Sequence, residues 1–325
     1  MAVKIVTDST ATLTKEQIDQ YDLRQVTLFI VQDGKAEPEI DMDVHEYYKR
    51  LMDLENLPTT SQPTTASMVE AFEEILDQGN DVLGIFVSGA LSGTLDGART
   101  AASIIEERRP EAKGRIALVN SQSNGMALTY PVIEAATLAQ EGASLEECRE
   151  IAEYVSSCTR FLFAPKSLEH LARGGRIGRA SALLGTALKL CPILGPDKVT
   201  GAVHTYAKVR TYPKALNTIK DKMLADIEAS GGLKGLCVHY IPNREEGEKF
   251  LKEVLLPAIQ AKYPKMEVPL FPIKPTIGTH VGPAIGLVYW TSNPMIKENV
   301  GGMGLAESAK GKLSERVQEL RAKRS

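Results

Sequence analysis

The sequence predicts an α/β protein: a parallel-sheet α/β domain in the N-terminal half and a smaller α+β domain in the C-terminal half. Strand-like and helix-like segments alternate up to about residue 157, which is typical of βαβ units. The segment at 81–88 is almost continuously apolar, as expected of a strand buried on both faces of a parallel sheet. Hydrophobic residues make up 43% and charged residues 24%, which is ordinary for a globular protein.

The elements of the first half follow from local signals in chain order. Runs rich in β-branched and apolar residues predict strands, and apolar residues at helical spacing predict helices. Thr14 with Gln17, and Ser144 with Glu147, form capping boxes that open two of the helices. Strands are expected at 4–7, 25–31, 81–88 and 115–120, and helices after Thr14 and at 66–78, 97–109, 126–141 and 145–157.

After residue 158 the pattern changes to short strands mixed with helices around a smaller sheet. Strands are expected at 161–165, 235–240 and 266–271, helices at 168–173, 212–230 and 245–262, and short β-like runs within 192–212. We therefore expect an N-terminal domain at 1–158, a C-terminal domain at 159–290 and an extension at 291–325. The extension carries three apolar residues at helical spacing, which predict a short surface helix and leave open a transient membrane contact.

Composition and charge exclude several classes of protein. The 38 Lys and Arg residues nearly balance the 41 Asp and Glu residues, giving a net charge of -3, which argues against non-specific nucleic-acid binding. No apolar stretch approaches the roughly 20 residues of a membrane span, and the N-terminus lacks the apolar core of a signal peptide. We expect a soluble, cytoplasmic protein. The four cysteines form no C-x-x-C pair or zinc-finger spacing, so we expect reduced thiols and no metal.

The common nucleotide and catalytic motifs are missing from the sequence. It contains no Walker A loop, no G-x-G-x-x-G, no G-x-S-x-G and no H-E-x-x-H. A doubly wound fold usually carries its nucleotide on a glycine-rich loop of this kind. The protein is therefore expected either to bind another ligand or to rely on a partner for the nucleotide.

Three hydroxyl-rich segments lie at predicted strand-to-helix junctions, at 7–10, 59–64 and 88–94. Ligands of open α/β sheets bind beyond the carboxyl ends of the strands. Helix N-termini there offer free N–H groups, and Ser and Thr hydroxyls add to them, which makes a cradle for an anion. The alternative is that each Ser or Thr only caps its helix.

A fourth segment, at 278–283, places His280 between glycines. Glycine permits close approach of the backbone to a ligand. A lone histidine is otherwise a hydrogen-bonded structural residue, and that alternative stays open for His280.

Taken in chain order, these segments resemble the DegV family of bacterial fatty-acid-binding proteins over roughly residues 3–290. The resemblance is carried by Thr7-Asp8-Ser9, Thr60-Ser61-Gln62-Pro63, the segment at 88–94, Leu168-Glu169-His170-Leu171 with the turn at 173–177, and the segment at 278–283. Small departures from the family pattern, at Ala90, Leu95 and Ala284, remove no polar ligand group.

The resemblance implies a DegV-type fold that holds one long-chain fatty acid between its two domains. It places the carboxylate at Thr60, Ser61, Ser92 and His280, with nearby N–H groups from Gly93 and Thr94. The family presents that carboxylate to a separate fatty acid kinase, which brings ATP and forms an acyl-phosphate for phospholipid synthesis. The carrier then needs no catalytic residue, metal or cofactor of its own.

Several basic residues of the second half could form a patch near the carboxylate end. The resemblance favours Arg173 and Arg176 in this role, with Arg210 beside them, as a surface facing the kinase or the acyl-phosphate. The alternative is an ordinary solvated surface.

Two other functions compete with the carrier. One is an enzyme, either a hydrolase using Ser92 with His280 or a phosphotransfer subunit using His280. The absence of a nucleophile elbow, and of an Asp placed to orient His280, argues against the hydrolase. The other is a regulatory module that binds a different small anion.

Overall fold

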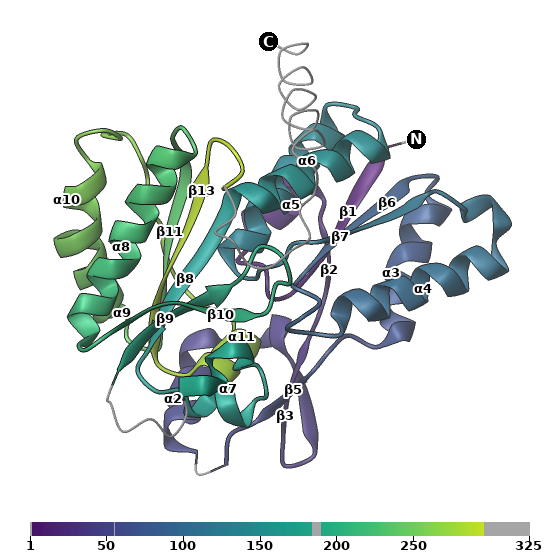
Figure 1. Ribbon diagram of the computed structural model, residues 1–325. Coiled ribbons are helices and arrows are strands. Elements are labelled where there is room, and N and C mark those ends of the chain that lie inside the picture. The colour runs from purple at the N-terminus through teal and green to yellow at the C-terminus, as the bar shows by residue number, and fades with distance from the viewer. Residues whose placement is uncertain (1, 55, 184–189, 296–325) are drawn as a thin grey trace.

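The computed structural model confirms the α/β class and its parallel sheet (Figure 1). It describes residues 2–54, 56–183 and 190–295. The expected helix of the C-terminal extension falls within 296–325, outside those residues. No helix in the described ranges is long and apolar enough to cross a membrane.

The first sheet has four parallel strands in the order β2-β1-β6-β7. They are β2 (Arg24–Val26), β1 (Val3–Asp8), β6 (Asp81–Phe86) and β7 (Ile116–Asn120). Alternate residues of β6 are buried on opposite faces: Val82 packs against α3 (Thr65–Asp77) and α4 (Thr94–Arg108), whereas Leu83 packs against α5 (Met126–Gln140) and α6 (Leu145–Cys158). Helices on both faces explain why this strand is apolar throughout.

The capping boxes predicted from the sequence are formed. Thr14 accepts a hydrogen bond from the Gln17 N–H and returns one to the Gln17 side chain at the start of α1 (Lys15–Tyr21). Ser144 and Glu147 do the same at the start of α6. These reciprocal bonds fix where the two helices begin.

The second sheet is larger than the first, so the expectation of a smaller sheet was wrong. Its six strands run in the order β10-β9-β8-β13-β11-β12. The short β-like runs expected within 192–212 form the pair β9–β10, whereas β13 was not expected. The strands are β8 (Thr159–Pro165), β9 (Cys191–Pro196), β10 (Val203–Val209), β11 (Leu233–Ile241), β12 (Leu270–Pro272) and β13 (Ala284–Thr291).

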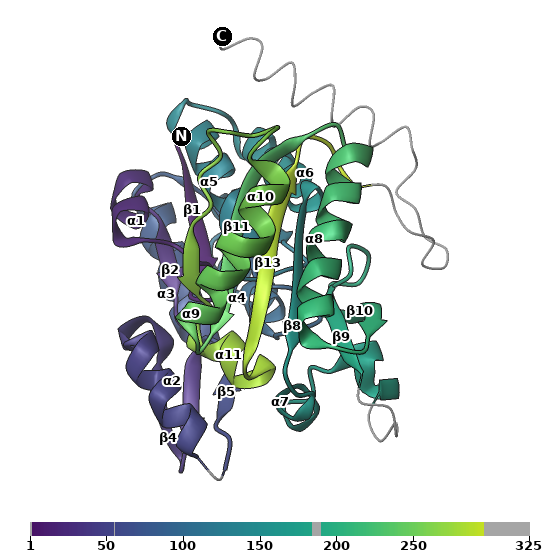
Figure 2. The ribbon, with the colours of Figure 1, turned by 90° about the vertical axis from the view of Figure 1, so that its left-hand side faces the viewer.

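The faces of this sheet pack against different partners. Leu162 of β8 is buried beneath α8 (Tyr212–Ala229), α9 (Arg244–Lys249), a π-helical turn (Phe250–Leu255) and α10 (Leu256–Ile259), which Figure 2 shows in front of the sheet. The predicted helix at 245–262 is thus divided by the π-helical turn. Phe161 and Phe163 of β8 are buried on the other face, which is turned toward the first half of the chain.

A third, three-stranded sheet was not predicted. It consists of β4 (Lys35–Pro38), β3 (Phe29–Gln32) and β5 (Thr59–Ser61), with α2 (Val44–Asp53) beside it. The expected strand at 25–31 is therefore two strands in different sheets. Short 3₁₀ turns lie at Glu39–Asp41, Pro110–Ala112 and Gly178–Leu183, and the short helices α7 (Glu169–Arg173) and α11 (Pro275–Val281) lie near β5 in Figure 1.

The helix α5 contacts both large sheets, touching β1 on one side and β13 on the other. The helix α6 ends at Cys158 and β8 begins at Thr159, so the proposed domain boundary falls between the elements of the two sheets. The loops at the carboxyl ends of β1, β6 and β7 then face the inner side of the second sheet, and this arrangement builds the site.

Candidate functional site

The ends of two parallel strands bring hydroxyl-rich loops together as the sequence predicted. The carboxyl group of Asp8, at the end of β1, accepts hydrogen bonds from the Thr10 N–H (3.0 Å), the Thr10 hydroxyl (2.5 Å) and the Val87 N–H after β6 (2.7 Å). Burial raises the pKa of Asp8 to about 6. Asp8 therefore joins the two loops from a fully buried position.

The hydroxyl-rich segment at 59–64 has a different local structure from the one expected. Thr59–Ser61 is strand β5, paired with β3, and not a strand-to-helix junction of the parallel sheet. The segment nevertheless lies close to His280, because the small sheet is beside α11, which carries that residue.

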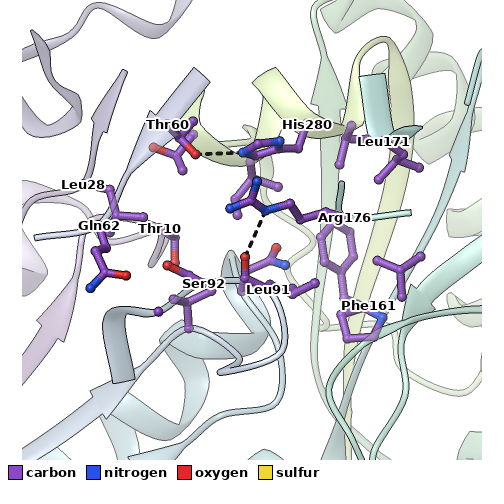
Figure 3. A pocket seen from close by; sticks show the side chains of 18 of the residues that line it. Thr10, Leu28, Thr60, Gln62, Leu91, Ser92, Phe161, Leu171, Arg176 and His280 are labelled. Carbon is purple, nitrogen blue, oxygen red and sulfur yellow. Dashed lines mark hydrogen bonds between the residues drawn. The ribbon is translucent and has the colours of Figure 1, made fainter. Parts of the chain in front are cut away.

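These loops and the second sheet enclose a cavity of about 270 Å³ (Figure 3). One part of its wall is polar and the other is apolar. The polar residues are Thr10, Thr60, Ser61, Gln62, Ser92, Gly93, Asn124, Arg176, Thr276 and His280. The apolar residues are Leu28, Val87, Leu91, Phe161, Phe163, Leu171, Pro196, Val203, Ile277 and Val281.

The cavity has an exposed end and a buried end. Ser61 and Gln62 are exposed to solvent, which places them at its mouth. Phe161 and Phe163 are only 5% and 4% exposed, which places them in the interior. A ligand with a polar head and an apolar body would therefore lie with its head toward the mouth.

Five of the six residues predicted to hold a carboxylate line this cavity: Thr60, Ser61, Ser92, Gly93 and His280. Thr94 is buried in the first turn of α4 and is not part of the lining. Its hydroxyl lies 2.9 Å from Ser92 Oγ, and its N–H donates to the same atom at 3.3 Å. Thr94 thus orients Ser92.

His280 is held in place from two sides. Its Nε2 lies 2.8 Å from the Thr60 hydroxyl, as Figure 3 shows. A Cβ atom on Gly174 would lie 2.1 Å from its Nδ1, so only glycine at that position leaves room for the ring. Burial, together with the charge of Arg176, lowers the pKa of His280 to about 4. The imidazole is therefore neutral at physiological pH.

The helix α4 begins at the cavity wall. Gly93 is its N-cap and makes no side-chain cap hydrogen bond. The first N–H groups of a helix lack intrahelical partners and carry the positive end of the dipole. The side chain of Gln62 lies over this turn, because a Cβ on Gly93 would come within 2.0 Å of Gln62 Oε1. The N-terminus of α4 favours an anion beside Ser92.

The three predicted basic residues are in different environments. Arg176 lines the cavity, where its Nε donates to the Leu91 carbonyl (3.3 Å) and its Nη1 to the Gly174 carbonyl (2.6 Å). Arg173 is exposed and pairs with Glu169 at 2.7 Å, one helical turn earlier. Arg210 is exposed, directly after β10. Only Arg176 can reach a ligand in the cavity.

Two polar residues of the wall, Asn124 and Thr276, were not among those predicted from the sequence. Asn124 follows β7, which is another parallel strand ending at this edge, so the rule applied to 7–10 and 88–94 would have found it. Thr276 lies in the first turn of α11, a seven-residue helix that was not predicted because it is too short for an amphipathic pattern.

The geometry does not form the pair that a serine hydrolase requires. His280 Nε2 hydrogen-bonds Thr60, and Ser92 Oγ hydrogen-bonds Thr94. Within the described residues no carboxylate hydrogen-bonds His280, so nothing orients it as a base for Ser92. The same residues contain no cluster of His, Cys, Asp and Glu that could hold a metal ion.

Comparisons with known proteins match nearly the whole described chain. The family model described as "Uncharacterised protein, DegV family" matches residues 2–292. A DegV domain-containing protein of Clostridium acetobutylicum is 36% identical over 296 residues, covering 91% of this chain and 100% of the relative.

Solved structures give the same relationship. A DegV family protein from Thermus thermophilus, described for its fatty acid binding, superimposes with a TM-score of 0.77 at 28% identity, covering 89% of this chain and 99% of that one. DegV of Bacillus subtilis, described as a fatty acid binding protein, gives a TM-score of 0.76 at 31% identity, with the same coverage. Fold and sequence therefore agree, and the chain belongs to the DegV family.

Proposed function

We propose that this protein binds one long-chain fatty acid in the cavity, with the carboxylate at Thr60, Ser61, Ser92, Gly93 and His280. The observation that carries the proposal is a single cavity with hydroxyls, an imidazole and a helix N-terminus at its exposed end and phenylalanines at its buried end. The fatty acid binding described for the relatives from Thermus thermophilus and Bacillus subtilis supports it.

The two ends of the ligand contribute differently to binding. A carboxylate leaving water needs several donors to offset its lost hydration, and hydroxyls with helix N–H groups supply them. Each buried methylene contributes about 0.8 kcal/mol, so the fourteen of a sixteen-carbon acid contribute on the order of 11 kcal/mol before costs. Burial of the chain then provides most of the affinity, and the polar end sets the orientation.

The finer part of the proposal is presentation to a partner. The carboxylate at the mouth would be offered to a separate cytoplasmic fatty acid kinase, which supplies ATP and forms the acyl-phosphate used in phospholipid synthesis. This chain then acts as a carrier without catalysis of its own. The exposure of Ser61 and Gln62 supports such a route, because a head at the mouth is accessible to another protein.

In this proposal the exposed arginines contact the partner kinase. Arg173 and Arg210 would face the kinase, and Arg176, which lies in the wall, would stabilise the charge of the acyl-phosphate. The proposed domains, 1–158 and 159–290, would hold the ligand between them.

Binding is tested by titrating delipidated full-length protein with stearate. Ser92→Ala and His280→Ala each remove a polar group from the carboxylate end, so we expect each to weaken binding by about tenfold while the fold is retained. Thr100→Ala, on the exposed side of the same helix α4, is the matched control and should bind like the parent. Unchanged affinity in both site variants would show that the carboxylate lies elsewhere.

Presentation is tested in a reconstituted reaction with the fatty acid kinase. The double variant Ser92→Ala, His280→Ala should form much less acyl-phosphate. Arg173→Ala should slow transfer and keep its bound lipid, whereas Arg244→Ala, which removes the same kind of ion pair to Glu248, should behave like the parent. Loss of lipid from Arg173→Ala would place that residue in the ligand site and not in the docking surface.

A further inference from the structure

Gln62 lines the mouth of the cavity, next to the residues proposed to hold the carboxylate. The preceding residue, Ser61, pairs with Phe29 in the small sheet. The following residue, Pro63, is buried and keeps the backbone of Gln62 extended, because the residue before a proline disfavours the helical conformation. The origin of the Gln62 side chain is therefore fixed, although the side chain itself is exposed.

The side chain of Gln62 lies along the first turn of α4. A Cβ atom on Gly93 would overlap Gln62 Oε1, and it would lie 3.1 Å from Cδ and 3.5 Å from Nε2 of the same side chain. A Cβ atom on Gly97, one turn further along the helix, would lie 3.4 Å from Gln62 Nε2. Figure 3 shows the amide of Gln62 turned toward Ser92. The amide is thus beside the N-terminus of α4, where the carboxylate is expected.

The amide of Gln62 can present either a donor or an acceptor to the head of a ligand. Its oxygen is the end nearer to Gly93, where it faces the positive end of the helix dipole. Rotation about the terminal bond of a glutamine exchanges its oxygen and its NH₂ group, which are similar in size. A carboxylate only accepts hydrogen bonds, so it is matched by the NH₂ end. An exposed side chain can make this rotation without disturbing the core.

We propose that Gln62 is a further carboxylate-binding residue, whose amide donates to the head from the solvent side and favours ionised acids over lipids with a neutral head. A hydrogen bond to a charged group is stronger than one between neutral groups, so the gain is larger for a carboxylate than for an alcohol. This inference rests on the proposed fatty acid binding and adds a residue that sets its specificity.

The test compares stearate with octadecanol, which carries the same length of chain and a neutral head. In delipidated full-length protein, Gln62→Ala should weaken stearate binding about fivefold and octadecanol binding less than about twofold. Gln62→Glu places a second carboxylate beside the head, so it should weaken stearate binding about tenfold or more and leave octadecanol nearly unchanged. Gln78→Glu makes the same charge change at the exposed C-cap of α3 and should bind both ligands like the parent.

A double-variant cycle tests whether Gln62 acts from its place beside Gly93. The three atoms nearest to a Cβ on Gly93 all belong to Gln62, so Gly93→Ala should push the amide aside. Alone, it should weaken stearate binding about as much as Gln62→Ala does. In the Gln62→Ala background the new methyl displaces no amide, so the double variant should bind stearate like Gln62→Ala.

The results separate the role of Gln62 from fatty acid binding itself. If Gln62→Ala leaves stearate binding unchanged, or weakens stearate and octadecanol equally, Gln62 does not bind the carboxylate and the cavity still holds the acid. Full additivity of Gly93→Ala and Gln62→Ala would likewise refute the proposal. If the parent binds neither ligand, the proposed function fails. The Gln62 variants should melt at the temperature of the parent because the side chain is exposed, and the comparison of Gln62→Ala with the parent decides even if Gly93→Ala does not fold.

Discussion

Asp8 shows how one buried carboxyl organises the edge of the site. It joins the loops after β1 and β6 through three hydrogen bonds, and burial raises its pKa to about 6 from the 3.8 of a free aspartate. Between these two values the folded protein holds a proton that the unfolded chain has released. The contribution of Asp8 to stability is therefore complete below about pH 4 and decreases as the pH rises through 6.

Replacing Asp8 tests that linkage. As the pH rises from 4 to 7, the free energy of unfolding of the parent should fall relative to that of Asp8→Asn by on the order of 3 kcal/mol, since one pKa unit corresponds to about 1.4 kcal/mol. Denaturant unfolding at several pH values measures the difference. The control is Asp53→Asn, at an exposed position, and its free energy of unfolding should change with pH in the same way as that of the parent. Parallel curves for Asp8→Asn would contradict the raised pKa.

Residues of the site could be predicted from the sequence where the strand-end rule or flanking glycines indicated them. Ser92 and Gly93 lie where the rule for parallel strands places them, and His280 was indicated by its flanking glycines. Thr94 was predicted to lie in the site, but its hydroxyl hydrogen-bonds Ser92 and it does not line the cavity. Spacing along a loop does not reveal which way each side chain turns. Asn124 was missed through incomplete use of the same rule.

At the scale of elements, the close contact between β8 and β9 forms the base of the cavity. Gly195 of β9 faces the Phe161 carbonyl, and a Cβ atom there would lie 2.2 Å from that oxygen. Backbone cannot move aside as a flexible side chain can. The glycine is thus required for the close pairing of β9 with β8, the strand that carries Phe161 and Phe163 into the site.

Gly195→Ala should therefore lower the free energy of unfolding by about 2 kcal/mol or more and weaken ligand binding, because the strands must separate. Thermal unfolding and titration with stearate measure the two effects. Gly97→Ala in α4 is the matched control: its new methyl would meet only the flexible Gln62 side chain at 3.4 Å, and helix propensity favours alanine. Equal melting temperatures for the parent and Gly195→Ala would contradict the strand contact.

Elements with a clear local signal were predicted correctly, whereas several elements without one were not. The buried strand β6 and the capped helices α1 and α6 follow from local signals. The strands β2 and β3 were merged because only pairing partners far along the chain distinguish them. The helix α11 is seven residues long, too short for an amphipathic pattern, yet it carries His280.

At the scale of the molecule, Glu39 connects distant parts of the chain. It is 3% exposed and accepts hydrogen bonds from the Ser9 hydroxyl (2.5 Å) and the Thr276 N–H (2.6 Å). Ser9 Oγ in turn accepts from the Leu28 N–H at 2.9 Å. One carboxyl thus links the end of β1 to α11, which holds His280 over the cavity.

Glu39→Gln should destabilise the protein by about 1–3 kcal/mol, because an amide cannot accept both hydrogen bonds on two oxygens. Binding of stearate should also weaken through the loosened position of α11. Glu37→Gln removes an exposed ion pair to Arg50 and should cost less than about 1 kcal/mol. Denaturant unfolding of both variants measures the contrast, and equal stabilities would show that Glu39 does not couple the two regions.

The fold class could be predicted from the sequence more completely than the pairing of the strands. Alternating elements indicated the parallel sheet, but the six-stranded sheet depends on antiparallel pairing between residues more than a hundred positions apart, which no local pattern records. The cavity forms only because the loops of the parallel sheet face the six-stranded sheet.

The central claim is that an apolar chain with an acid head occupies this cavity. Purified full-length protein, extracted with organic solvent and analysed by quantitative mass spectrometry, should release close to one long-chain fatty acid per chain, and Ser92→Ala with His280→Ala should release less. Protein that carries no fatty acid after purification, and takes up none when long-chain acids are added, would contradict the account.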